Sequence, residues 1–273
     1  MYSILIASMA AAAVFLSSWR LGDVAWGWAL LWGVLAFFAT MFLVNFIIRK
    51  RITAIMDDMQ ALLESGQKEM QIRVNAYQNR PVGDPKRVMA EMEGLQKKLL
   101  AEALAFTEKL EPFCKWTPLF SRQLNTTRMQ FHYQMKDFKK VDELMPRCLI
   151  LEPMGAAMKM ARQHVNKEPP EAIERTFIKA KARLKYNQSA LLYALLAWIY
   201  LKNDMPDKAH ALLVNGCKDN ENETLNRNRD RLANNKLREF SNAGFGDEWY
   251  ALFLEQPKIQ ARRQRPRFDG RPF

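Results

Sequence analysis

The side chains best suited to metal binding or nucleophilic chemistry are few and far apart in this sequence. A metal site on a helix needs ligands three or four residues apart, or in closely spaced pairs. No histidine lies four residues from another histidine or from a cysteine, and the three cysteines are widely spaced, so that no disulfide framework is visible. We therefore predict isolated histidines and buried, free thiols rather than a metal centre. These residues are His132, His164, His210, Cys114, Cys148 and Cys217.

Motifs for nucleotide binding and nucleophilic catalysis are also missing. Gly244-Phe245-Gly246 has two glycines of a dinucleotide fingerprint, but no strand pattern precedes it and no third glycine follows, so we interpret it as a turn between helices. The sequence contains no P-loop and no nucleophile-elbow serine. Asp57 and Asp58 fall on the solvent face of an amphipathic helix. We predict a protein that is not an enzyme and has no cofactor.

Positive charge is the strongest remaining chemical signal. The 273-residue chain has a formal net charge of +12, and the excess follows residue 48 because Arg20 and Asp23 cancel. Residues 256–273 form a basic, proline-containing tail of a composition typical of disordered segments. Such a tail either stays solvated or binds anionic lipid or RNA. The candidate residues for an anionic partner are Arg262, Arg263, Arg265, Arg267 and Arg271.

Two uncharged apolar segments near the N-terminus predict a hairpin of two membrane-spanning helices. As helices, residues 3–19 would extend about 25 Å and residues 24–48 about 37 Å, against a bilayer core of about 30 Å. Three tryptophans flank the tight turn between them, as in an interfacial aromatic belt. The alternatives are a cleaved secretory signal over residues 1–22 and a hairpin buried in a soluble core. No basic residue precedes the first segment, which argues against the signal.

The basic residues Arg49, Lys50 and Arg51 set the predicted orientation of this hairpin. They follow the second span directly, whereas the turn between the spans has one arginine beside an aspartate. Because positively charged loops stay in the cytoplasm, we expect both termini and the soluble part there.

Residues 49–118 are predicted to form amphipathic helices close to the membrane. One apolar stripe at helical spacing runs from Ile52 to Leu63, and a second runs from Val88 to Leu110 after a loop rich in proline and glycine. The second stripe suits a partner helix. Two interpretations stay open: a helical hairpin within the chain, or a coiled coil that joins two copies into a homodimer.

From residue 119 to residue 255 a pattern of helix, short turn and helix recurs. In the clearest unit, large and small side chains share one face of each helix: Tyr193, Leu196, Ala197 and Tyr200 in the first, and Ala209, Leu213 and Gly216 in the second. This unit resembles a tetratricopeptide repeat, in which small residues let two helices cross closely and large ones fill the gaps. The resemblance implies an α-solenoid that binds a peptide or protein.

Two weaker copies of the pattern precede this unit. The first has Phe138, Val141, Met145 and Cys148 in the same register, with Pro153 at the closing proline position. The second would pair a helix around Ala157–Ala161 with one around Ile173–Ala180. The residues that occupy the same second-helix site are then 32 and 36 residues apart, near the period of about 34; they are Val141, Ile173 and Ala209.

A last helix pair is predicted to cap the repeats. A polar helix would run from Asn222 to about Phe240, and an apolar one would lie within residues 248–257. The predicted division of the chain is therefore a transmembrane hairpin (1–48), juxtamembrane helices (49–118), repeats similar to tetratricopeptide repeats (TPR) with a cap (119–255) and a basic tail (256–273).

This order of segments resembles that of bacterial inner-membrane adaptors. Examples are the membrane-bound repeat component of Pel-type exopolysaccharide machinery and the HemY-type membrane repeat protein. The resemblance implies an all-α, non-enzymatic scaffold in a bacterial inner membrane, whose cytoplasmic repeats bind a protein or peptide partner. The net charge of +12 leaves one alternative, a membrane-associated protein that binds RNA or the ribosome.

Overall fold

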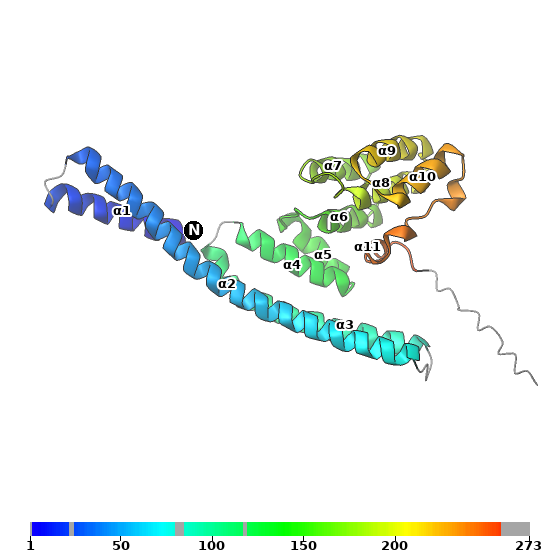
Figure 1. Ribbon diagram of the computed structural model, residues 1–273, viewed down its shortest axis with the longest axis horizontal. Helices are drawn as coiled ribbons and strands as arrows, with labels where there is room; N and C mark the ends of the chain where they lie inside the picture. The colour runs from blue at the N-terminus through cyan, green and yellow to red at the C-terminus, as the bar shows by residue number, and fades with distance from the viewer. Residues whose placement is uncertain (1, 22–24, 80–84, 117–118, 258–273) are drawn as a thin grey trace, which may run out of the picture. The chain divides into compact units, whose positions relative to one another are not determined.

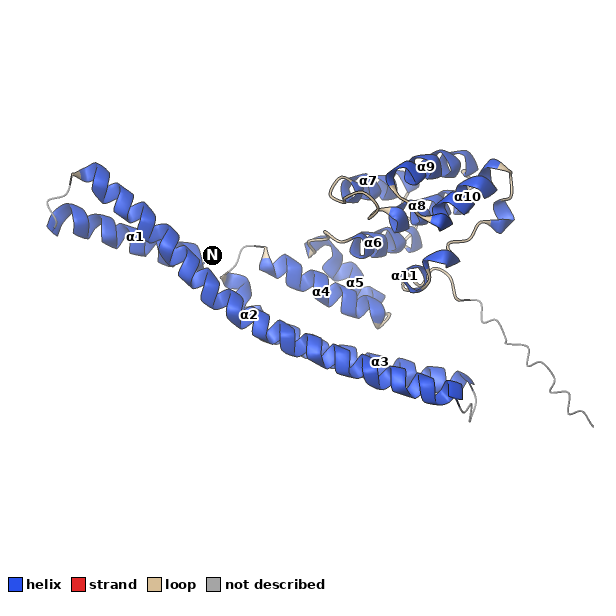
Figure 2. Ribbon diagram, viewed as in Figure 1, coloured by secondary structure: helices blue, strands red, loops and turns tan. Residues whose placement is uncertain are grey.

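The computed structural model describes residues 2–21, 25–79, 85–116 and 119–257, and every regular element in them is a helix (Figures 1 and 2). The prediction of an all-α chain is confirmed for these residues. The chain divides into two compact units, Met1–Ile150 and Leu151–Phe273. The first repeat-like segment belongs to the first unit, together with the long N-terminal helices, and the later segments belong to the second.

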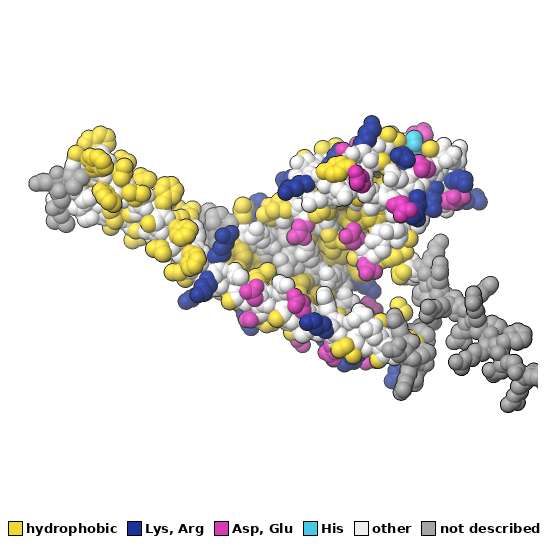
Figure 3. Space-filling model, in the orientation of Figure 1, with side chains coloured by type: hydrophobic (Ala, Val, Ile, Leu, Met, Phe, Trp, Pro, Cys, Tyr) yellow, Lys and Arg dark blue, Asp and Glu magenta, His cyan; other side chains and the backbone are white. Residues whose placement is uncertain are grey.

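Helix α1 (Tyr2–Leu21) and the first part of α2 (Trp26–Asn79) form an antiparallel pair with apolar side chains on the outside. Phe38 is 65% exposed and Phe42 is 71% exposed, and Figure 3 shows hydrophobic side chains covering this pair. Water disfavours so much exposed apolar surface, whereas lipid does not. Both helices are long and apolar enough to cross a membrane. They correspond to the predicted spans 3–19 and 24–48, except that Val24 lies outside the described residues.

Small residues let the two apolar helices approach closely. Ala7 and Ala29 are fully buried. A Cβ atom on Gly33 would lie 3.3 Å from both the carbonyl oxygen of Ala11 and the Cβ of Phe15. Packing through small residues is how helices associate in lipid, where apolar side chains gain nothing by leaving their surroundings.

Helix α2 continues without a break for 54 residues, so the apolar segment passes directly into the amphipathic one. Helix α3 (Pro85–Lys109) packs along it in the opposite direction (Figure 1). Gly66 permits close contact, because a Cβ there would lie 2.5 Å from the methyl carbons of Leu99. Of the two interpretations left open by the sequence, the hairpin within the chain is present, and a homodimer stays a prediction.

The rest of the first unit consists of short helices: η1 (Glu111–Lys115), α4 (Phe120–Gln134), α5 (Phe138–Leu144) and η2 (Met145–Arg147). Phe131 of α4 joins a buried cluster with Met59 of α2 and Ala103 of α3, which ties α4 to the hairpin. Of the packing residues predicted for α5, Val141 is fully buried and Phe138 is half-buried with its ring against Tyr133.

The first weak copy departs from its predicted register at the end of α5. The helix stops at Leu144, Met145 is buried in a 3₁₀ turn, and Cys148 is extended, with φ −80° and ψ 152°. Pro146 explains the change, because proline has no N–H and its ring collides with the carbonyl of residue i−4 in an α-helix. Pro153 also corrects the prediction: it begins the next helix instead of closing this one.

The second unit contains α6 (Pro153–Val165), α7 (Pro170–Lys181), α8 (Ala190–Lys202), α9 (Pro206–Asp219) and α10 (Glu223–Ala233). Helix α8 lies at the centre and packs against α6, α7, α9 and α10 (Figure 1). All ten residues from Leu191 to Tyr200 are buried. The predicted packing residues of α8 are among them, but these ten residues leave no solvent face, whereas the sequence pattern predicts a single packed face.

Helix α9 crosses α8 through its small residues. Ala209, Leu213 and Gly216 are buried. A Cβ on Gly216 would lie 2.9 Å from Cγ and Cδ1 of Tyr193, which is closer than side-chain packing allows. The glycine is therefore the reason that these two helices can cross at this distance.

Four helices end in the same backbone turn. The second residue past each helix has a positive φ, between 55° and 62°, and the next N–H donates to the carbonyl five residues before it at 2.8–2.9 Å. This is the Schellman arrangement, which normally uses glycine. The positive-φ residues follow α4, α6, α8 and α10; they are Lys136, Lys167, Asp204 and Asn235.

The C-terminal cap differs from the predicted helix pair. Helix α10 ends at Ala233, and the chain continues through η3 (Leu237–Glu239), η4 (Ala243–Phe245) and the single turn α11 (Asp247–Tyr250). Asn234 and Asn235 end α10 early, since asparagine tolerates the left-handed conformation.

Buried polar contacts hold this C-terminal segment on α8. Asn242, fully buried, donates to the carbonyl oxygen of Ala194 at 3.0 Å. The carboxylate of Glu255 accepts from Nε1 of Trp198 at 2.8 Å and from Nε1 of Trp249 at 2.9 Å. The cap is thus an irregular segment fixed by side chains rather than a second long helix.

Candidate binding groove

A groove of about 700 Å³ lies at the N-terminal ends of α6, α8 and α10 in the second unit. The segment before α6, the α7–α8 connection, the α9–α10 connection and the η4–α11 segment each contribute to its lining. Its residues are Leu151, Glu152, Pro153, Met154, Arg183, Leu184, Lys185, Asn187, Gln188, Ala190, Leu191, Glu221, Asn222, Phe245 and Glu248.

Charges of both signs line the groove. Arg183 and Lys185 come from the α7–α8 connection, and Glu152, Glu221 and Glu248 come from three other elements. No ion pair joins any of these five side chains to another residue in the described part of the chain. Apolar residues lie between them, and Leu151 at the edge is 52% exposed. The groove can therefore contact a ligand that is itself partly apolar and partly charged.

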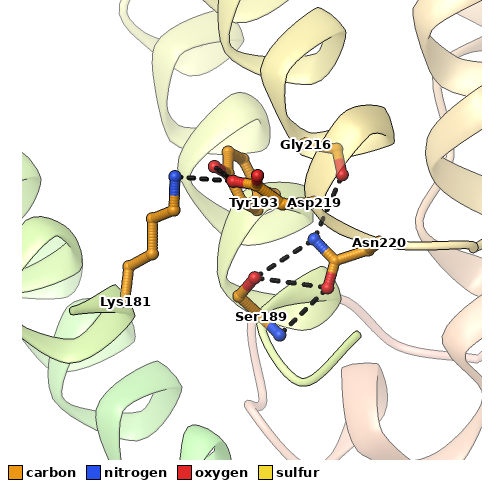
Figure 4. A network of polar contacts seen from close by, with 6 residues as sticks. All are labelled: Lys181, Ser189, Tyr193, Gly216, Asp219 and Asn220. Carbon is orange, nitrogen blue, oxygen red and sulfur yellow. Dashed lines mark hydrogen bonds and ion pairs between the residues drawn. The ribbon is translucent and has the colours of Figure 1, made fainter. Parts of the chain in front are cut away.

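A buried asparagine joins the two connections that form much of the lining (Figure 4). Oδ1 of Asn220 accepts from the backbone N–H of Ser189 at 3.1 Å, and its Nδ2 donates to the carbonyl oxygen of Gly216 at 3.1 Å. Asn220 is 1% exposed and Ser189 is 4% exposed. Buried polar groups that are all hydrogen-bonded hold backbone segments in one arrangement. Asn187 adds a further link, since its Oδ1 accepts from the N–H of Glu221 at 3.1 Å.

An ion pair lies next to this asparagine. Oδ2 of Asp219 lies 2.6 Å from Nζ of Lys181 and accepts from the hydroxyl of Tyr193 at 2.5 Å (Figure 4). The hydrogen bond from Lys181, followed by that from Tyr193, lowers the pKa of Asp219. Burial, followed by the hydrogen bond to Asp219, raises the pKa of Tyr193. The tyrosine therefore stays protonated, and the trio connects α7, α8 and α9.

The histidines and cysteines considered as metal ligands or nucleophiles do not form a shared site in the described residues. Over the described residues, no three His, Cys, Asp or Glu side chains are grouped so that they could hold a metal ion. Burial raises the pKa of the Cys114 and Cys217 thiols, which disfavours the reactive thiolate. Burial, then the charge of Lys202, lowers the pKa of His164, whose ring packs edge-on against Trp198 at 5.2 Å.

Gly244-Phe245-Gly246 spans the end of η4 and the residue that precedes α11. Gly246 has φ +57°, a conformation that favours glycine, and it caps α11. A Cβ on Gly244 would lie 2.1 Å from Oγ1 of Thr224, so the turn packs directly on α10. The interpretation of this stretch as a turn agrees with the structure, and Phe245 lines the groove.

The predicted charge sites fall in different places. Arg49, Lys50 and Arg51 are exposed on α2, directly after the buried Ile48. The tail candidates from Arg262 to Arg271 lie outside the described residues, so binding of lipid or RNA by the tail stays a prediction.

Sequence reasoning missed most of the groove. Of the lining residues, the sequence patterns single out Pro153, Asn222 and Phe245, each for a different reason. The signal that was available is the density of polar residues in the two connections, 182–189 and 219–222. Neither a family model, nor a curated protein, nor a solved structure matches this chain. Its function has to be argued from its own residues.

Proposed function

We propose that this chain is a non-enzymatic, membrane-anchored adaptor that binds a peptide segment of a protein partner in the groove of its second unit. The groove is the observation that carries the proposal. It is open, hydrogen bonds between Asn220 and Ser189 join two of the connections that line it, and its lining mixes apolar and charged residues. Small-molecule pockets are mostly apolar with a few polar groups, whereas five charged side chains suit an extended polypeptide.

The repeated turns support an interpretation as helical repeats. The positive-φ residues that end α4, α6, α8 and α10 are at positions 136, 167, 204 and 235, so successive separations are 31, 37 and 31 residues. Tetratricopeptide units repeat about every 34 residues and commonly bind peptides. We propose that these helix pairs are divergent units of that type, which form an α-solenoid.

The apolar helices supply the anchor in this proposal. Helix α1 and the first part of α2 would cross a bacterial inner membrane, and Arg49, Lys50 and Arg51 would keep the soluble part in the cytoplasm. The adaptor would then hold its partner at the membrane surface.

Site-specific photo-crosslinking in intact cells tests the groove. A photoreactive residue replaces Leu151 at the groove edge or, as a matched control, Ile178 on α7, which is 55% exposed and does not line the groove. We expect a defined protein adduct at Leu151 and none at Ile178. Reversing two groove charges, Arg183→Glu with Lys185→Glu, should lower the adduct yield several-fold. The same adducts at both positions, or a yield indifferent to the charge reversal, would overturn the proposal.

A further inference from the structure

The α2–α3 hairpin returns the chain to the end of the apolar segment. Along the hairpin, Arg73 pairs with Glu91 at 2.9 Å, Gly66 faces Leu99, and Met59 shares a cluster with Ala103. Successive contacts therefore approach Arg51 on α2 as α3 proceeds toward its C-terminal end. The segment after α3, which begins at Leu110, reaches the level where α2 changes from apolar to charged.

This returning segment contacts the first residues of α1. Oγ of Ser3, which is fully buried, donates to the carbonyl oxygen of Trp116 at 2.8 Å. The rings of Tyr2 and Trp116 meet edge to face, with centroids 5.5 Å apart. The two contacts join parts of the chain that are 113 residues apart.

The contact point coincides with the basic end of the second apolar segment. Gly33 faces Ala11 and Phe15 in the antiparallel pair, and Tyr2 precedes these two residues by 9 and 13 positions. Tyr2 therefore lies beside residues 42–46 of α2, just before Arg49. Lys115 belongs to the returning segment as well. Glu111, the acidic residue of that segment, is paired with Arg128 at 2.9 Å.

We propose that residues 111–116 form a second membrane-contacting element, which lies in the headgroup layer and binds the phosphates of anionic phospholipids. Tyr2 and Trp116 are the aromatic anchor at the interface, where such rings partition preferentially. The basic collar consists of Arg49, Lys50 and Arg51 together with Lys115, and its charge is complementary to an anionic leaflet. This inference rests on the membrane insertion in the proposed function. It means that α4 begins at the membrane surface and not at the far end of the long hairpin.

Fluorescence quenching on the full chain in vesicles tests the position of the segment. Cys114 is the native thiol of the segment and takes an NBD label once Cys148 and Cys217 are serine. In a cysteine-free background, Phe38→Cys reports on the middle of the second apolar helix and Gln71→Cys on the far part of the hairpin. The vesicles are phosphatidylcholine with phosphatidylglycerol and contain a lipid with a nitroxide near the headgroup, or iodide in the buffer.

We expect the labels at Cys114 and Phe38→Cys to be protected from iodide, with the Cys114 label quenched by the nitroxide, and Gln71→Cys to be quenched by iodide alone. A Cys114 label as open to iodide as Gln71→Cys, with Phe38→Cys protected, would refute the headgroup contact and leave the anchor intact. A Phe38→Cys label open to iodide would refute the anchor and this inference with it.

Lipid selectivity tests the basic collar. Each basic residue near an anionic surface contributes attraction equivalent to about five-fold in binding. We therefore expect Arg51→Gln with Lys115→Gln to lower phosphatidylglycerol enrichment around the full chain by several-fold in native mass spectrometry. The matched variant Lys68→Gln with Lys98→Gln removes the same charge from the hairpin and should leave the enrichment unchanged. An equal effect of both variants would contradict lipid binding by the basic collar.

Discussion

Replacing Glu255 by glutamine should weaken the attachment of the C-terminal segment to α8. The carboxylate accepts one indole N–H on each oxygen, from Trp198 at 2.8 Å and from Trp249 at 2.9 Å. The two indole rings lie edge to face at 5.8 Å, and Trp249 is fully buried. Glutamine has nearly the same size but one oxygen acceptor and one NH₂ donor. One indole N–H would then face another donor.

The expected loss follows from these two hydrogen bonds. A hydrogen bond to a charged group contributes about 1.5–3 kcal/mol, and a buried donor left without a partner costs about 1–3 kcal/mol. We expect Glu255→Gln to lower the free energy of unfolding of the second unit by about 2–4 kcal/mol. Trp198→Phe removes one of the competing donors, so the remaining glutamine oxygen can serve Trp249. The double variant should therefore lose about 1–2 kcal/mol less than the sum of the single losses.

Urea unfolding of the full chain in detergent, followed by near-ultraviolet circular dichroism of the tryptophan pair, measures these free energies. Glu239→Gln is the matched control, since Glu239 makes only an exposed ion pair with Lys236 at 3.5 Å. It should change the free energy of unfolding by less than about 0.5 kcal/mol. If Glu255→Gln behaved like this control, or if the two substitutions were additive, the bridge would not hold the segment as we describe.

Two further predictions concern the packing of α9 on α8 and the ion pair of Asp219 with Lys181. Gly216→Ala should destabilise the second unit by about 1–2 kcal/mol, because the new methyl group would overlap the Tyr193 ring. As a control, Gly94→Ala, whose new methyl meets nothing within 4 Å, should stabilise the first unit by about 0.5–1 kcal/mol. Urea unfolding of both variants measures these changes, and a stabilising Gly216→Ala would contradict the close crossing of α8 and α9. Because Lys181 lowers the pKa of Asp219, the ion pair stabilises the fold above the ordinary aspartate pKa of about 4, and that stabilisation is lost as the pH falls through the lowered value. Asp219→Asn should flatten the acid-side decline of a thermal-unfolding series, and an unchanged pH profile would count against it.

The sequence alone predicted the helices and the two apolar N-terminal segments well. Helical periodicity and the absence of alternating strand patterns are local properties, and they led to the all-α assignment that the described residues confirm. Two uncharged runs likewise identified α1 and the start of α2 to within a few residues. Two helices end earlier than predicted, and in both cases residues at the helix end account for it. Pro146 ends α5, and Asn234 with Asn235 ends α10.

Tertiary contacts decided the rest, because apolar periodicity shows which face of a helix is buried but not what buries it. Helix α8 is apolar on every side, so its sequence contains no preferred face, and only the presence of four neighbouring helices makes it central. The contact of Trp116 with Ser3 and the bridge from Glu255 to Trp198 join residues 113 and 57 positions apart. Many polar partners exist at such separations, and the fold selects one. The groove has the same origin, since its lining comes from connections that no local pattern brings together.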